Sequence, residues 1–140
     1  MKREIFGSPG FWLLPLLLLL LGGLYLFLIR PDVAGFFYDD GMYLMAAKSL
    51  VSGHGYRLAG MLDQPLFYKY PPLYSVCLAL VLFVTPAFPS NILWLKSLNV
   101  LFALGALGLL WFYFRRQRAF PVWLCAGLLL LFGTNWRFIE

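Results

Sequence analysis

The sequence predicts an all-α integral membrane protein with about four transmembrane helices and an amphipathic interfacial helix in the first external loop. Of its 140 residues, 62% are hydrophobic and 12% are charged, whereas an ordinary soluble domain has roughly 45–50% and 25%. A soluble fold of this size buries too little surface to hide so much apolar side chain. Disorder is excluded too, because disordered chains are poor in aromatic residues, which make up 19% here.

The first apolar run, residues 11–29, is long enough to cross a bilayer. At a rise of about 1.5 Å per residue it extends roughly 28 Å, close to the thickness of the hydrocarbon layer. Lys2 and Arg3 precede it, as in a signal peptide. The run is longer than a usual signal sequence and no A-x-A cleavage site follows it, which favours a retained transmembrane helix.

A polar loop, residues 30–70, follows the first span and contains a short predicted helix at 39–52. Asp39 is placed to cap the start of this helix, and Gly53 stands where a glycine commonly ends one. Apolar residues recur at helical spacing along one face, for example Tyr43, Ala47, Leu50 and Val51. A helix of this length beside a span is expected to lie in the membrane interface.

Three further spans are predicted, at about 72–87, 92–114 and 121–136. The first of these begins with prolines, which suit the first turn of a helix because its amides have no internal partner. The second ends at Arg115 and Arg116, which mark a membrane boundary. No internal repeat divides the chain, so residues 1–140 are treated as one polytopic domain.

The charges give conflicting evidence on topology. Four alternating spans would place three Lys and Arg residues (Lys2, Arg3, Arg137) on the N-terminal side and seven on the side of the 30–70 loop (Arg30, Lys48, Arg57, Lys69, Arg115, Arg116, Arg118). The positive-inside rule would then place the loop in the cytoplasm, whereas the bases beside the first span favour a cytoplasmic N-terminus. We expect the loop to be external, and its bases to be available for an anionic ligand.

The candidate functional residues lie in this loop. Asp39 and Asp40 have the chemistry of a general base or of ligands for a divalent cation; the simpler alternative is that they cap the helix and complement its dipole. Lys69 and Tyr70 lie directly before the second span, where a lysine can meet a phosphate at headgroup height. Snorkelling and an interfacial aromatic belt explain the same pair. Arg57 is either a second phosphate contact or an exposed loop residue.

Other classes of partner have less support. The two cysteines, Cys77 and Cys125, match no metal or disulfide spacing. A divalent cation at Asp39 and Asp40 would need further ligands that the sequence does not identify, so the cofactor is unknown, with a divalent cation possible. No basic run is long enough to indicate nucleic acid.

The order of the motifs is more specific than any one of them. Y-D-D-G-M-Y at 38–43 opens the loop helix, and K-Y-P-P-L at 69–73 opens the second span. This order resembles the N-terminal end of the GT-C superfamily of membrane glycosyltransferases, and more narrowly its protein mannosyltransferase and aminoarabinose transferase relatives. The resemblance covers about residues 11–135.

The resemblance implies a donor made of a sugar on a polyprenyl phosphate, with transfer to an acceptor at the external face of a bacterial inner membrane. Asp39 takes the place of the family's catalytic base or metal residue, and Asp40 takes the second acidic place. Lys69 lies near the family's phosphate-binding lysine. In many relatives that lysine directly precedes two prolines, whereas Tyr70 intervenes here.

Members of the family are several times longer and have more spans. The chain is therefore expected to be the N-terminal part of a transferase, inactive by itself. The alternative is a non-catalytic four-span membrane subunit or anchor whose charged loop binds another protein. The sugar and the acceptor are not identified by the sequence.

Overall fold

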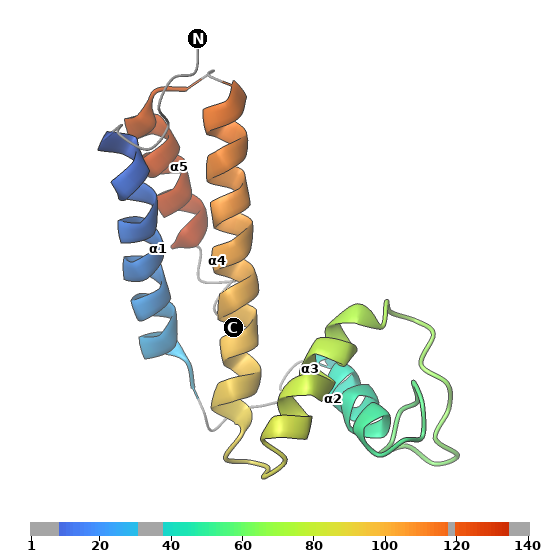
Figure 1. Cartoon of the computed structure of the whole chain (residues 1–140). Helices are drawn as coiled ribbons and strands as arrows, with labels where there is room; N and C mark the ends of the chain where they lie inside the picture. Colours follow the sequence, from blue (N-terminus) through green and yellow to red (C-terminus); the bar gives the residue numbers. More distant parts are fainter. Residues whose placement is uncertain (1–8, 31–37, 118–119, 135–140) are drawn as a thin grey trace. The chain divides into compact units, whose positions relative to one another are not determined.

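The computed structural model describes residues 9–30, 38–117 and 120–134, and this part of the chain is all-α. It contains five helices (Figure 1): α1 (Pro9–Leu28), α2 (Tyr38–Val51), α3 (Leu73–Val84), α4 (Ile92–Gln117) and α5 (Val122–Gly133). The predicted all-α class is confirmed, and each predicted helix has a counterpart. The chain divides into two compact units, residues 1–29 with 99–140 and residues 30–98, which are described separately.

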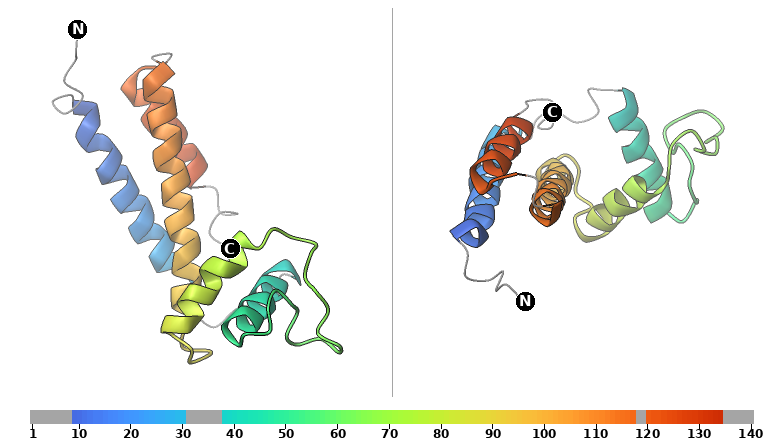
Figure 2. Two further views of the ribbon diagram at one scale, coloured as in Figure 1. Left: turned by 45° about the vertical axis from the view of Figure 1, so that its right-hand side comes forward. Right: turned by 90° about the horizontal axis from the view of Figure 1, so that it is seen from above.

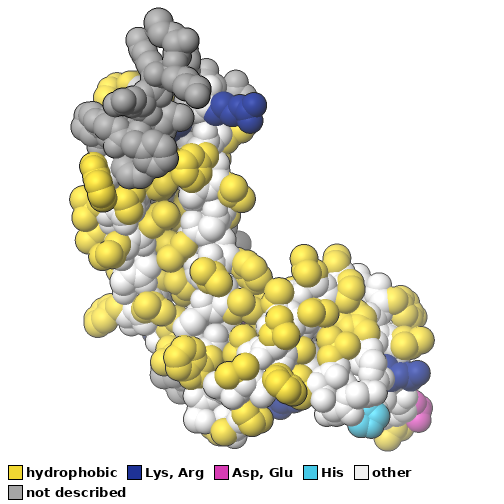
Figure 3. Space-filling view, viewed as in Figure 1, with side chains coloured by type: hydrophobic (Ala, Val, Ile, Leu, Met, Phe, Trp, Pro, Cys, Tyr) yellow, Lys and Arg dark blue, Asp and Glu magenta, His cyan; other side chains and the backbone are white. Residues whose placement is uncertain are grey.

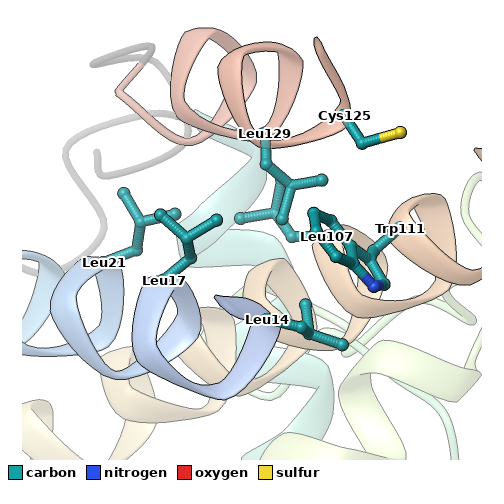
Figure 4. Packing of buried hydrophobic residues seen from close by; sticks show 7 residues of the cluster. All are labelled: Leu14, Leu17, Leu21, Leu107, Trp111, Cys125 and Leu129. Atoms are coloured by element: carbon teal, nitrogen blue, oxygen red, sulfur yellow. The ribbon is translucent and has the colours of Figure 1, made fainter. Parts of the chain in front are cut away.

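The first unit is a bundle of α1, α5 and the larger part of α4 (Figures 1 and 2). Leucines of all three helices meet Trp111 and Cys125 in its core (Figure 4): Leu14, Leu17, Leu21, Leu107 and Leu129. The glycines allow close approach, because Leu104 lies against Gly22 and Leu18 lies near Gly108. These two pairings run in opposite directions along the two helices, so α1 and α4 are antiparallel. The hydroxyl of Tyr25 donates a hydrogen bond to the carbonyl oxygen of Gly133, which fixes α5 against α1.

The outer surface of this bundle is also apolar (Figure 3). Large hydrophobic side chains of α1, α4 and α5 are exposed on it: Trp12, Leu19, Phe27, Leu101, Leu109, Phe112, Trp123 and Leu131. By length and composition, one helix among the described residues can cross a membrane, Ile92–Arg116. Three other apolar helices, Trp12–Leu28, Leu73–Val84 and Val122–Gly133, are shorter, at 10–17 residues.

In the second unit, α2 packs against α3 on one side and against the following loop on the other. Ala47 is buried in one cluster with Leu78, Leu82 and Leu95, whereas Ala46 and Met42 are buried in another with Leu58 and Phe67 of the loop. Small residues at 46 and 47 let both neighbours approach the helix closely. The hydroxyl of Ser75 in α3 donates a hydrogen bond to the carbonyl oxygen of Tyr43 (3.3 Å) and ties the two helices together.

Two local expectations for α2 were wrong. Asp39 is not the N-cap, because the helix begins at Tyr38 and Asp39 lies within its first turn. The apolar face is not the single one expected from spacing. Met42, Ala46 and Ser49 are buried in addition to Ala47, and Val51 is 42% exposed. Periodicity could not show this, because the loop that covers the second face lies further along the chain.

The end of α2 agrees with the prediction for Gly53. Its φ is +76°, in the left-handed region. Its amide donates to the carbonyl oxygen of Leu50 (3.1 Å), and the amide of His54 donates to that of Ser49 (3.0 Å). This pair of bonds is a Schellman motif, which satisfies carbonyls at the helix end and requires a residue that adopts positive φ.

Exchanging Gly41 in α2 and Gly53 after its end for alanine is expected to have opposite effects on stability. Gly53→Ala places a Cβ in the left-handed region and should lower the free energy of unfolding by about 1–2 kcal/mol. Gly41→Ala should raise it by about 0.5–1 kcal/mol, since Gly41 is helical and a Cβ there meets nothing within 4 Å. Chemical unfolding of both variants in detergent, followed by helical circular dichroism, checks the two signs. Changes of the same sign in the free energy of unfolding of the two variants would contradict the assigned end of α2.

The loop after α2 turns back on itself as a short hairpin. The amide of Leu58 donates to the carbonyl oxygen of Pro65, and that of Phe67 donates to the carbonyl oxygen of Tyr56, both at 3.0 Å. Asp63 lies at the turn with a φ of +66°. The hairpin returns Phe67 to the side of α2 and thereby brings the residues that follow it near the start of this helix.

Candidate functional site

The structure joins the two motifs on which the resemblance rests. The hydroxyl of Tyr70 donates a hydrogen bond of 2.6 Å to Oδ1 of Asp39, although 31 residues separate the two positions. Asp39 is exposed in the first turn of α2, and Tyr70 is half-buried in the segment that precedes α3. The bond leaves Oδ2 of the carboxylate as a second acceptor, so an exposed base and an anchored phenol form the centre of the candidate site.

A group of aromatic rings holds Tyr70 in place. The centroid of its ring is 5.3 Å from that of Tyr43 and 5.6 Å from that of Phe67. Tyr43 also meets Tyr74 edge to face at 5.0 Å. The hydroxyl of Tyr56 donates to the carbonyl oxygen of Tyr70 (3.3 Å). Since packed aromatic pairs favour such geometries, the cluster restricts both the ring and the backbone of Tyr70.

The phenol of Tyr43 is affected by the same surroundings. Burial raises its pKa, and Tyr56, Tyr70 and Asp39 raise it further. These surroundings favour the neutral phenol of Tyr43 over the phenolate.

Lys69 brings a positive charge to the same place. Its Nζ lies 4.8 Å from the centroid of the Tyr70 ring, a cation–π geometry. The side chain is exposed. Tyr70 thus contacts both Lys69, which is predicted to bind the phosphate, and Asp39, the predicted base. This is a structural reason for a tyrosine to stand between Lys69 and the two prolines.

Asp40 has a different environment from Asp39. Partial desolvation raises the pKa of its carboxyl above the ordinary 3.8; the ammonium of Lys96 lowers it and the Asp39 carboxylate raises it. Lys96 also donates a hydrogen bond of 2.9 Å to the carbonyl oxygen of Arg30. Because the folded chain binds this proton more tightly, the carboxyl favours the folded state at low pH, and its contribution is lost as the pH rises past the raised value.

Two substitutions should move the pKa of Asp40 in opposite directions. Lys96→Met removes the charge that lowers it, so the pKa rises further. Asp39→Asn removes a charge that raises it, so the pKa falls. A ¹³C NMR titration of the carboxyl in selectively labelled protein measures both shifts, with Lys48→Met, on the exposed surface of α2, as the control. Shifts of the same sign would contradict this arrangement of charges.

Arg57 lies in another part of the loop. Its Nη1 donates to the carbonyl oxygen of Gln64 (3.3 Å) across the hairpin. With His54 and four residues of the hairpin turn (Met61, Leu62, Asp63, Gln64) it lines an open hollow of about 610 Å³. Asp39, Lys69 and Tyr70 do not line this hollow. The predicted pairing of Arg57 with Lys69 on one phosphate stays a prediction.

A divalent cation was a possible cofactor. Over residues 9–30, 38–117 and 120–134, no three His, Cys, Asp or Glu side chains come together as a metal-binding group. Asp39 and Asp40 supply two carboxylates, and a cation site at this pair would need further ligands.

Sequence reasoning missed two residues of the site. Tyr43 lies four positions after Asp39, one turn along the same helix, and this spacing could have indicated it. Lys96 could not be found in this way, because its position near Asp40 depends on how the chain turns between α3 and α4. At that turn, Nδ2 of the buried Asn91 donates to the carbonyl oxygen of Thr85 (2.7 Å).

Comparison with known proteins adds no relative. No protein-family profile matches the chain, and neither the curated proteins nor the solved structures contain a significant match.

Proposed function

We propose that the chain is the N-terminal part of an integral membrane glycosyltransferase of the GT-C type. It would take its sugar from a polyprenyl-phosphate donor at the external membrane face. The observation that carries the proposal is the hydrogen bond between Asp39 and Tyr70. It unites an acidic helix start with a lysine-bearing segment that is distant in sequence, in the order in which GT-C transferases carry these parts.

The reaction needs a base and a cation at neighbouring positions. A hydroxyl or amine of the acceptor attacks the anomeric carbon of the donor, the bond between that carbon and the phosphate oxygen breaks, and the lipid phosphate leaves with the bonding electrons. The Asp39 carboxylate accepts the proton of the acceptor, and Tyr70 fixes the orientation of that carboxylate. Lys69 stabilises the departing phosphate as a point charge.

The apolar exterior of α1, α4 and α5 supports a membrane location. Lipid and the polyprenyl tail are the expected neighbours of these side chains, so the polar loop has only the sugar and the phosphate to recognise. The proposed location is a bacterial inner membrane with the 30–70 loop external. Of the four spans expected from the sequence, α1, α4 and α5 stay proposed spans.

Binding of undecaprenyl phosphate to the purified chain in detergent tests the donor site. Lys69→Met should weaken binding about tenfold, corresponding to about 1.4 kcal/mol. Lys48→Met is a matched control, because Lys48 is also exposed and stacks on an aromatic ring, that of Phe88, at 4.5 Å. Undecaprenol, which lacks the phosphate, should bind equally to wild type and to Lys69→Met.

Two outcomes would contradict the proposal. Equal affinity for undecaprenol and undecaprenyl phosphate would mean that the loop does not bind the phosphate. Unchanged phosphate-dependent binding in Lys69→Met would place the phosphate elsewhere. Either result would favour the alternative of a non-catalytic membrane subunit or anchor.

A further inference from the structure

The directions of α1 and α4 bear on how the chain crosses the membrane. The two helices pack antiparallel in their bundle, with Leu104 against Gly22 and Leu18 near Gly108. If both helices cross a bilayer, the chain leaves the bilayer at residue 29 and enters it again at residue 91, on the same side of the membrane. Four alternating spans would make α1 and α4 parallel, because α3 would carry the chain back across between them. The observed packing therefore conflicts with a crossing at α3.

The packing of α3 agrees with this conclusion. It has 12 residues and extends about 18 Å, as does α5, so the directions of α1 and α4, and not length, distinguish α3 from a span. One of its faces packs on α2 through Ser75, Leu78 and Leu82. The rest of its surface exposes large apolar side chains: Leu73, Val76, Leu80, Phe83 and Val84.

We propose that α3 does not cross the membrane but lies on the bilayer surface, with its exposed apolar side chains inserted among the lipids. Residues 85–91 join α3 to α4, the helix that is long enough to cross, and even fully extended they reach only about 25 Å. This tether keeps α3 close to the surface at which α4 enters. A lipid surface is thus the occupant that the apolar face meets. The inference does not depend on the proposed transferase activity.

The same topology lessens the conflict among the charges. With α3 uncrossed, five bases fall on one side, Lys2, Arg3, Arg115, Arg116 and Arg118, and five on the other, Arg30, Lys48, Arg57, Lys69 and Arg137. The counts are then equal, and the bases beside the first span, which usually dominates the orientation, decide it. The side of Lys2 and Arg3 is the cytoplasmic one, and residues 29–91, with Asp39, Tyr70 and Lys69, are external.

Single cysteines test the topology in the full chain, in a Cys77→Ala, Cys125→Ala background, with a membrane-impermeant maleimide on intact cells. Ser52→Cys and Ser90→Cys, both exposed, lie before and after α3 and should react from the same side, the outside. Arg116→Cys should react only after permeabilisation. If Ser52→Cys and Ser90→Cys react from opposite sides, α3 crosses and the proposal is wrong.

Two additions make the result decisive. Epitope tags inserted after Ser52 and Ser90 in the wild-type chain give the same comparison without removing the native cysteines, in case the background variant does not fold. A fluorophore at Leu80→Cys in vesicles of anionic and zwitterionic lipid should be quenched by shallow lipid nitroxides, whereas one at Leu101→Cys in α4 should respond to deeper ones. A Leu80 probe that behaves like the exposed His54→Cys would exclude insertion of α3.

Discussion

Asp39→Asn is expected to lower sugar transfer by the proposed full-length transferase by about 10²- to 10⁴-fold, the usual contribution of a general base. Asparagine keeps the size of the side chain, and its amide oxygen can still accept the hydrogen bond from Tyr70. It cannot take a proton from the acceptor. Membrane insertion and helical content should therefore stay unchanged while transfer is lost. The measurement is incorporation of radiolabelled sugar from a polyprenyl-phosphate donor in membrane vesicles.

Asp63→Asn is the matched control for this experiment. Asp63 is an exposed carboxylate of the same loop, and its φ of +66° is one that asparagine tolerates. This variant should retain wild-type activity. Tyr70→Phe should fall between the two, because it keeps the aromatic contacts but removes the bond that orients Asp39. Full activity in Asp39→Asn would remove the catalytic assignment, even if donor binding persisted.

Leu129→Ala is expected to have the largest effect on stability, lowering the free energy of unfolding by about 2–5 kcal/mol, the usual range for a buried leucine. Leu129 is 0% exposed and lies in the core of the first unit with Leu107, Trp111 and Leu21 (Figure 4). Removing its side chain leaves a cavity between three helices. Thermal unfolding in detergent micelles measures the loss.

The control for this cavity lies on the same helix. Leu131 is 73% exposed and, in the proposed membrane setting, faces lipid or detergent, so Leu131→Ala leaves no cavity. Its unfolding temperature should stay near that of wild type. If both variants lost the same stability, the loss would come from helix propensity or lipid contact, and the packing of α5 on α1 and α4 would be wrong.

The sequence predicted the helices well because their signals are local. Apolar runs, the prolines before residue 73 and the glycine at 53 are sufficient to place α1 to α5 within a few residues. The second span was predicted at about 72–87; the helix there, α3, ends at Val84, and Thr85 turns away with a φ of −128° and a ψ of 77°.

The candidate site was less predictable because it depends on tertiary contacts. The sequence indicated Asp39, Asp40, Lys69 and Tyr70 as separate features, each with a simple alternative explanation. Their meeting requires the hairpin that returns Phe67 to α2, which is fixed by two backbone hydrogen bonds and a buried ring. The spacing of apolar residues does not indicate that the hairpin brings Phe67 back to α2.

The most direct test of the account is to locate the donor phosphate on the chain. A polyprenyl phosphate with a photoreactive diazirine on its first isoprene unit is bound to the protein in vesicles and irradiated, and the crosslinked peptides are identified by mass spectrometry. We predict crosslinks within residues 68–74, reduced in Lys69→Met and outcompeted by undecaprenyl phosphate. Crosslinks confined to the helices of the first unit, unchanged in Lys69→Met, would contradict a donor site at Asp39, Tyr70 and Lys69.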